Sequence, residues 1–138
     1  MNNISKHISY TEATENKRNI ENIPNDIQLK NMVVLAETVF EPLREAFGVP
    51  LHITSFFRSK ALNEAVGGSS TSQHLEGSAM DIDGDLSNVD NMKIGKWIEE
   101  NVEFDQLIYE KYNKKTNKCN WIHVSYRKNK NRKQILYK

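Results

Sequence analysis

The stretch that decides this fold is SQHLEGSAMD, at residues 72–81. It places an imidazole at His74 and a carboxylate at Asp81, with Gly77 between them, where a loop enters an apolar run. A turn at Gly77 can bring the two side chains to one point. A buried carboxylate is costly unless it is paired or bound to a metal, so an acid within this apolar run indicates a site rather than a plain core strand. Asp83 would share the strand face of Asp81 and is its chief rival.

A second stretch, WIHVS at residues 121–125, alternates in a way that predicts a strand with His123 and Ser125 on one face. Zinc favours imidazole nitrogen and carboxylate oxygen, and a catalytic zinc site has three protein ligands and an open fourth position. These residues predict a zinc site formed by His74, His123 and an acid of the apolar run, Asp81 or its rival Asp83. On spacing alone, ordinary hydrogen-bonded histidines remain the alternative.

The elements around these stretches predict an α+β fold, a small sheet flanked by helices. Helical spacing of apolar residues favours one long helix that Pro42 divides, because proline removes a backbone donor and clashes with the preceding turn. The predicted helices cover residues 11–17, 27–47, 60–66 and 88–102. The predicted strands cover residues 51–56, 79–82, 106–109, 121–126 and 134–137, and a Gly- and Ser-rich loop covers 67–71.

Length and composition predict a single core. The chain has 138 residues, of which 38% are hydrophobic and 27% charged, and this suits one domain. We assign residues 1–22 to a polar, loosely held N-terminal segment and residues 23–138 to the functional domain. Cys119 is the only cysteine, so no internal disulfide can form. No apolar run is long enough for a membrane span, and the N-terminus lacks a signal-peptide pattern, which predicts synthesis in the cytoplasm without a signal peptide.

The motifs together resemble a known superfamily. SQHLEGSAMD and WIHVS match Ser-x-His-x-x-Gly-x-Ala-x-Asp and Trp-x-His-x-Ser, the paired signatures of zinc D-Ala-D-Ala carboxypeptidases and related phage peptidoglycan endopeptidases. ITSFFRSKALN, at residues 53–63, resembles a third element, Ser-x-x-Arg-Ser-x-x-x-Asn. FDQLIYE, at residues 104–110, is similar to a segment of the small phage and prophage branch. The resemblance runs from about Pro24 to Tyr126, and Asp81 rather than Asp83 is the residue that aligns.

The resemblance implies the fold shared by Hedgehog signalling domains and these peptidases, with an antiparallel sheet that presents zinc in an open cleft. It implies hydrolysis of a peptide bond in the stem peptides of peptidoglycan, either next to a D-amino acid or between L-Ala and D-Glu. It also suggests action at the bacterial cell wall after release by a phage or prophage route. Function depends on the site rather than on the fold, so a zinc-containing wall-binding module without activity is the alternative.

Residue chemistry assigns further roles. Arg58 is suited to stabilise an oxyanion or to hold a substrate carboxylate, and we expect Ser72 and Ser125 to contact or orient the substrate. Many relatives carry Glu or Asp three residues before the last zinc histidine, but this chain has Asn120, which cannot accept a proton at neutral pH. By elimination we predict Glu110 as general base, close to His123 across a hairpin. Glu76 and Asp83 are the fallback candidates, and an ion pair with a neighbouring lysine is the structural alternative for Glu110.

Charge is unevenly distributed along the chain. Residues 111–138 carry ten Lys or Arg and no acid, while the first 110 residues carry all 18 acids. Such a segment is often a solvated sheet edge, because lysines block edge-to-edge pairing. Its functional interpretation is attraction to an anionic wall polymer. Nucleic acid is disfavoured, because the interleaved aromatic and glycine residues of nucleic-acid modules are sparse here.

Overall fold

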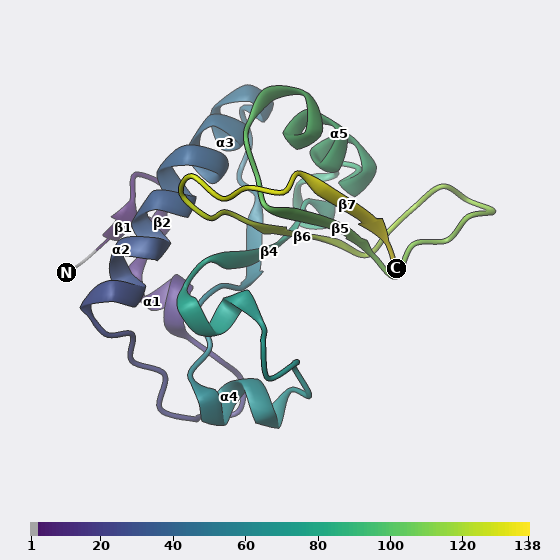
Figure 1. Ribbon diagram of the computed structural model, residues 1–138. Helices are drawn as coiled ribbons and strands as arrows, with labels where there is room; N and C mark the ends of the chain where they lie inside the picture. The colour runs from purple at the N-terminus through teal and green to yellow at the C-terminus, as the bar shows by residue number, and fades with distance from the viewer. Residues whose placement is uncertain (1–2) are drawn as a thin grey trace.

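Five strands form the sheet that carries both decisive stretches (Figure 1). In the computed structural model, which describes residues 3–138, their order across the sheet is β3-β4-β6-β5-β7. The strands are β3 (His52–Ser55), β4 (Ala79–Asp83), β5 (Gln106–Glu110), β6 (Trp121–Ser125) and β7 (Gln134–Tyr137). All neighbours are antiparallel except β5 and β7, which are parallel. The mixed α+β arrangement is thus as predicted, but the expected all-antiparallel sheet is wrong at this edge.

The register of the central strands sets the positions of the site residues. Asp81 on β4 lies opposite His123 on β6, and His123 lies opposite Ile108 on β5. Glu110 lies opposite Trp121, two positions further along the same face. Because side chains alternate between faces, the residues between them point the other way, into the core. These core residues are Met80, Ile82, Ile122, Val124, Leu107 and Tyr109, all fully buried.

Helices cover the apolar face of the sheet. Figure 1 shows α2 (Asp26–Leu35), α3 (Glu41–Phe47) and α5 (Asn91–Asn101) gathered on one side, with the short α4 (Lys60–Ala65) apart from them. The predicted long helix is divided near Pro42, because a π-helical turn, η1 (Ala36–Phe40), precedes the proline. The wider turn accommodates a residue that cannot donate a helical hydrogen bond. Among residues 3–138, no helix has the length and apolar character needed to cross a membrane.

The N-terminal segment packs into the same core rather than being loosely held. It forms β1 (Asn3–Ser5), β2 (Ile8–Ser9) and α1 (Tyr10–Thr14), shorter than the helix predicted for residues 11–17. Ile4, Ile8 and Ala13 belong to the main hydrophobic cluster. Asn22 is also buried; its amide donates hydrogen bonds to the carbonyls of Thr14 (2.8 Å) and Phe57 (2.9 Å). The sequence did not predict this packing, because the apolar residues of the segment are few and widely spaced.

This packing predicts that Ile8→Ala lowers the free energy of unfolding by about 2–4 kcal/mol, the usual cost of removing a large buried aliphatic side chain. Urea denaturation measures the change. Ile23→Ala is the matched control, because Ile23 is 66% exposed, and it should shift stability by less than about 0.5 kcal/mol. Equal effects from the two variants would contradict the packing of the N-terminal segment into the core.

Candidate metal centre

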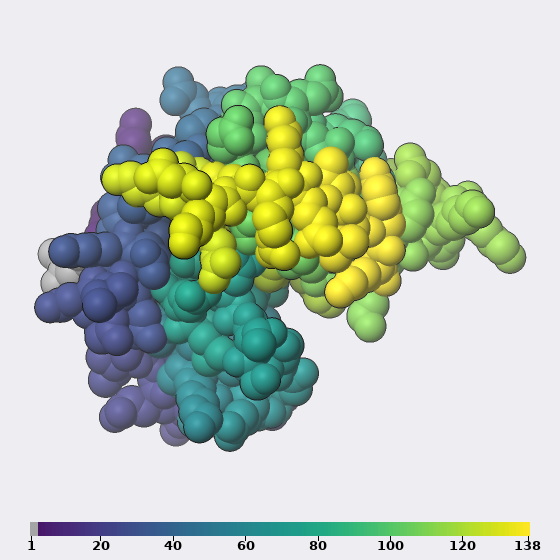
Figure 2. Space-filling model, in the orientation of Figure 1, coloured from purple at the N-terminus to yellow at the C-terminus, as the bar shows by residue number. Residues whose placement is uncertain are grey.

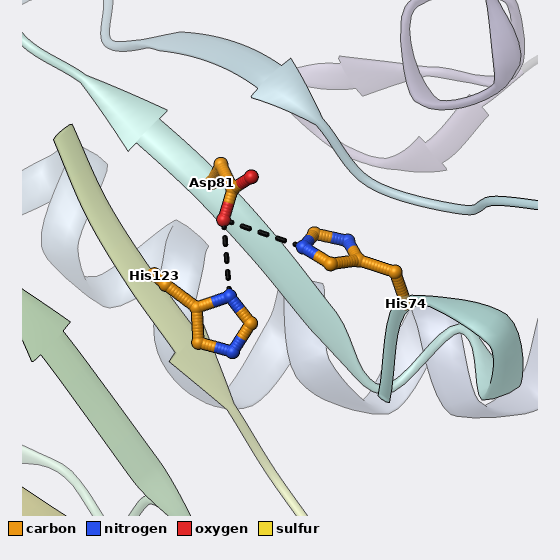
Figure 3. Close-up of side chains that lie close together, drawn as sticks. All are labelled: His74, Asp81 and His123. Atoms are coloured by element: carbon orange, nitrogen blue, oxygen red, sulfur yellow. Dashed lines mark hydrogen bonds and ion pairs between the residues drawn. The ribbon is translucent and has the colours of Figure 1, made fainter. Parts of the chain in front are cut away.

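Three side chains from separate elements meet on the open face of the sheet (Figure 3). His74 comes from a 3-10 turn, η2 (Gln73–Glu76), while Asp81 and His123 come from the paired strands β4 and β6. Asp81 Oδ1 lies 3.3 Å from His74 Nε2 and 3.1 Å from His123 Nδ1. Their candidate ligand atoms all lie within 4.8 Å of one another, close enough to hold one metal ion. Among residues 3–138, no other group of three or more His, Cys, Asp or Glu side chains is placed to hold a metal ion.

The protonation of His74 shows why this cluster suits a cation. His74 Nδ1 lies 2.7 Å from the backbone oxygen of Phe56, and a carbonyl can only accept, so Nδ1 carries the proton. In the neutral ring Nε2 therefore presents a lone pair. That atom is buried and has no hydrogen-bond partner, although it faces the Asp81 carboxylate. A cation between two such electron-rich atoms would be stabilised by both, and the second hydrogen bond of a metal-binding histidine commonly fixes its tautomer in this manner.

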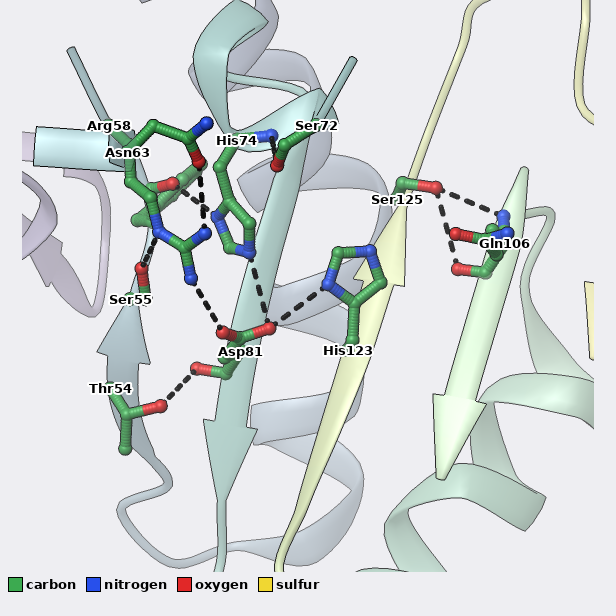
Figure 4. A network of polar contacts seen from close by, with 11 residues as sticks. Thr54, Ser55, Arg58, Asn63, Ser72, His74, Asp81, Gln106, His123 and Ser125 are labelled. Carbon is green, nitrogen blue, oxygen red and sulfur yellow. Dashed lines mark hydrogen bonds and ion pairs between the residues drawn. The ribbon is translucent and has the colours of Figure 1, made fainter. Parts of the chain in front are cut away.

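Arg58 is held at the edge of the cluster by the third sequence motif (Figure 4). Its Nε donates to Ser55 Oγ at 3.0 Å and its Nη1 to Asn63 Oδ1 at 3.3 Å. Its Nη2 lies 3.5 Å from Asp81 Oδ2. The backbone N–H of Arg58 also donates to the carbonyl of His74 at 3.1 Å. The third motif, the η2 turn and β4 are thus joined around one carboxylate.

Burial and neighbouring charges act in opposite directions on the acids of the site. Burial would raise the pKa of Asp81, but the two imidazoles outweigh it, so the pKa lies below its ordinary value and the group stays ionised. Burial raises the pKa of Glu110, and the Asp81 charge adds to the rise while His123 opposes it. Burial lowers the pKa of Arg58, against the charges of Asp81 and Glu110; a guanidinium nevertheless remains protonated.

Gly77 makes the turn that carries His74 to Asp81. Its φ of +73° is in the left-handed region that glycine tolerates. A Cβ at this position would lie 2.6 Å from the backbone oxygen of Gln28 on α2. The Gln28 amide in turn donates to the carbonyl of Leu75 at 3.1 Å. The glycine between the two site residues is therefore required both for its conformation and for close contact with α2.

The cluster opens into a cleft of about 660 Å³. The cleft lies between residues 69–73 and the C-terminal segment, and Figure 2 shows the surface hollowed between these teal and yellow parts of the chain. Residues predicted from the sequence that line it are Arg58, Ser72, His74, Asp81, Glu110 and His123. Ser72 also caps η2, since its Oγ accepts from the backbone N–H of His74 at 3.2 Å.

Other predicted residues lie elsewhere. Ser125 is completely buried and its Oγ accepts from the backbone N–H of Gln106 at 3.0 Å, so it joins β6 to β5 rather than facing substrate. Asp83, the rival ligand, accepts hydrogen bonds from Asn91 and from the backbone of Asp85 outside the cluster. Glu76 is an exposed partner of Arg127 at 3.8 Å. Alternation along a strand predicts a face, but not which positions on it neighbouring segments cover.

Asn120 is also outside the cleft. Its side chain is exposed and does not belong to the lining, while its backbone oxygen accepts from Asn91 at 3.0 Å. Glu110 lines the cleft, and its strand β5 pairs with β6, which carries His123. Of the two positions, only Glu110 faces the space above the cluster.

Asp105 is a structural residue of the site that the sequence analysis missed. It is fully buried and accepts from Gln73 Nε2 at 2.9 Å, next to His74 in the chain. Arg132 makes two further bonds to its carboxylate through Nε (3.0 Å) and Nη2 (2.9 Å). These bonds fasten the C-terminal segment and the η2 turn to the start of β5. The available signal was an acid directly before an apolar strand, whereas Asp81 was singled out as an acid within one.

Comparison with known proteins agrees with the geometry. Residues 6–125 match a family model described as Peptidase M15. The match covers most of the chain and begins within the N-terminal segment, so the protein belongs to the peptidase M15 family. A search of the curated proteins gives no match.

The Asp105 bonds lead to a pH-dependent prediction. The Arg132 side chain holds the pKa of Asp105 at about 2, below the roughly 3.9 of an unfolded chain. An acid whose pKa is lower in the folded state stabilises the fold above its unfolded pKa and loses that contribution as the pH falls. The free energy of unfolding at pH 7 should therefore be about 1–3 kcal/mol lower for Asp105→Asn than for wild type. Its difference from wild type should shrink as the pH falls from about 4 toward about 2.

Urea denaturation across this pH range checks the prediction. Asp85→Asn is the control, because Asp85 is an exposed acid whose side chain makes no ion pair among residues 3–138. A difference for Asp105→Asn that stays constant with pH would contradict a role for its charge.

Proposed function

We propose that the chain is a zinc-dependent peptidase that hydrolyses a peptide bond in bacterial peptidoglycan. The observation that carries the proposal is the buried, unpartnered Nε2 of His74, which faces Asp81 beside His123. Membership of the peptidase M15 family supports the peptidase class, and the donor set supports the metal. Two imidazole nitrogens and one carboxylate oxygen suit zinc and leave one coordination position for water or substrate.

The roles of the chain's own groups follow from their placement. When zinc is bound, such a site supplies an activated water and polarises the scissile carbonyl. Glu110, in the cleft and with a raised pKa, would take up the proton that the attacking water loses and pass it to the leaving amine. Arg58 would donate hydrogen bonds to the oxyanion of the substrate or to a nearby substrate carboxylate. Asp81 stays ionised beside Arg58 and keeps that guanidinium oriented.

Substrate binding would involve the walls of the cleft. Ser72 remains a candidate contact, whereas buried Ser125 does not. Three cations of the C-terminal segment, Arg127, Arg132 and Lys138, also line the cleft. Their charge supports stem peptides with free carboxylates as the substrate, and the basic segment as a contact for an anionic wall polymer. We retain the phage or prophage release route as part of this proposal.

A second candidate function is a zinc-containing wall-binding module without activity. It is favoured by Asn120 at the position where many relatives carry an acid. It predicts the same metal content but no peptide release from peptidoglycan, so the two functions separate in an activity assay.

The proposed metal site predicts about one zinc per chain in the purified protein. Asp81→Ala should lose the metal, and chelation should lower the melting temperature of wild type, because bound metal stabilises the folded state. Asp83→Ala is the matched control on the same strand and should keep its zinc. Elemental analysis measures both variants, and an Asp81→Ala protein that retains a full equivalent would overturn the ligand assignment.

The proposed base predicts that Glu110→Gln retains zinc but loses peptide release by about 100-fold or more, the scale of general-base catalysis. Because burial raises the pKa of Glu110, wild-type activity should fall with decreasing pH above the ordinary glutamate range, and this acid limb should vanish in the variant. Glu76→Gln, which changes an exposed acid outside the cleft, should remain active. Near-normal cleavage by Glu110→Gln would exclude Glu110. A wild type that binds zinc and releases nothing would favour the silent module.

A further inference from the structure

A second hollow lies on the other side of the metal cluster. It encloses about 690 Å³ and is bounded by the N-terminal segment, β3 and the end of α4. It shares three residues with the cleft already described, Arg58, Asp81 and Trp121. These three residues therefore lie where the two hollows meet, and of the metal cluster Asp81 borders both, while His74 and His123 line the cleft alone.

The strand order explains this arrangement. The cleft lies over β6 and β5, through His123, Ile108 and Glu110. The second hollow lies over the opposite edge, through Thr54 and Ser55 of β3. Since β4 with Asp81 stands between β3 and β6, the hollows together form one groove across the open face of the sheet. Asp81 of the candidate metal centre lies where the two halves of this groove meet.

The size of each half bears on the substrate. Both volumes fall within the range of about 300–1,000 Å³ that sites for drug-sized ligands occupy, and each exceeds the need of a single small amino acid. An enzyme that removes one terminal residue needs an extended site on only one side of the scissile bond. Two halves of similar volume suit a chain that continues in both directions.

The two halves differ in chemistry. Apart from the shared residues, the cleft carries the cations Arg127, Arg132 and Lys138. The second hollow has an apolar wall formed by Leu62 and the 43% exposed Val66, and its lining also includes charged side chains of both signs: Glu12, Glu15, Lys17, Arg18 and Asp83. The halves would therefore hold different parts of a substrate, the basic half taking free carboxylates and the other half taking a segment with both apolar and charged groups.

We propose that this groove binds a peptidoglycan stem peptide on both sides of the scissile bond, which makes the protein an endopeptidase rather than a carboxypeptidase. The inference rests on the proposed peptidase function and adds the position of the bond within the substrate. It assigns the second hollow, formed largely by residues before Val66, as a substrate subsite. The N-terminal segment thereby becomes part of the binding surface as well as of the core.

Mass analysis of products tests the bond position. The substrate is a purified disaccharide pentapeptide from peptidoglycan, digested by the zinc-loaded protein with and without chelator. We expect chelator-sensitive cleavage into two products that are each larger than one amino acid. Release of free alanine alone would overturn the endopeptidase inference and leave the peptidase function standing. The absence of any product, from this substrate or from whole peptidoglycan, would refute the peptidase function and the inference with it.

A variant of the second hollow tests the subsite directly. Val66→Trp should fill part of it and raise the KM for the disaccharide pentapeptide about tenfold or more, with kcat changed far less, because it removes binding remote from the chemistry. Ile27→Trp is the control, an equally apolar replacement at a 72% exposed helical residue outside both hollows. Zinc content and melting temperature close to wild type would show that both variants fold. An unchanged KM for Val66→Trp would overturn the assignment of the second hollow.

Discussion

The buried carboxylate of Asp81 is the constraint on which the site depends. Burial of an ionised acid is expensive, so its surroundings must supply compensating positive charge. Two imidazoles and the Arg58 guanidinium converge on it from three parts of the chain. His74 Nδ1 is committed to a backbone carbonyl and its Nε2 is left without a hydrogen-bond partner. A cation among the three side chains would be stabilised by that nitrogen and by the Asp81 carboxylate together.

The two faces of the sheet differ, and this difference brings the site residues together. One face is apolar and packs against α2, α3 and α5, which fixes the strand register. The other is open, and the same register places Asp81 beside His123 on it. Segments at the two ends of the chain then wall the groove: residues before β3 bound one half, and the basic C-terminal segment bounds the other. Asp105 holds the C-terminal wall in place through Arg132.

The sequence predicted the site better than its walls. Ligand spacing and strand alternation are local patterns, so the convergence of His74, Asp81 and His123 and the position of Glu110 in the cleft could be anticipated. Burial depends on residues far apart in the sequence, and it decided the outcome at Ser125, which is fully buried and accepts a hydrogen bond from the start of β5. The parallel pairing of β7 depends on where the chain returns after a loop, which local propensity does not specify. For the same reason the packing of the N-terminal segment and the second hollow emerged only from the structure.

X-ray absorption at the zinc edge tests the central claim, a metal held by two histidines and one aspartate, most directly. The account predicts a first shell of nitrogen and oxygen at about 2.0–2.2 Å, with the multiple-scattering pattern of two imidazoles. Cys119, the only cysteine, is buried away from the cluster, so no sulfur should appear. A shell with sulfur at about 2.3 Å, or protein that takes up no zinc when supplied with it, would contradict the account.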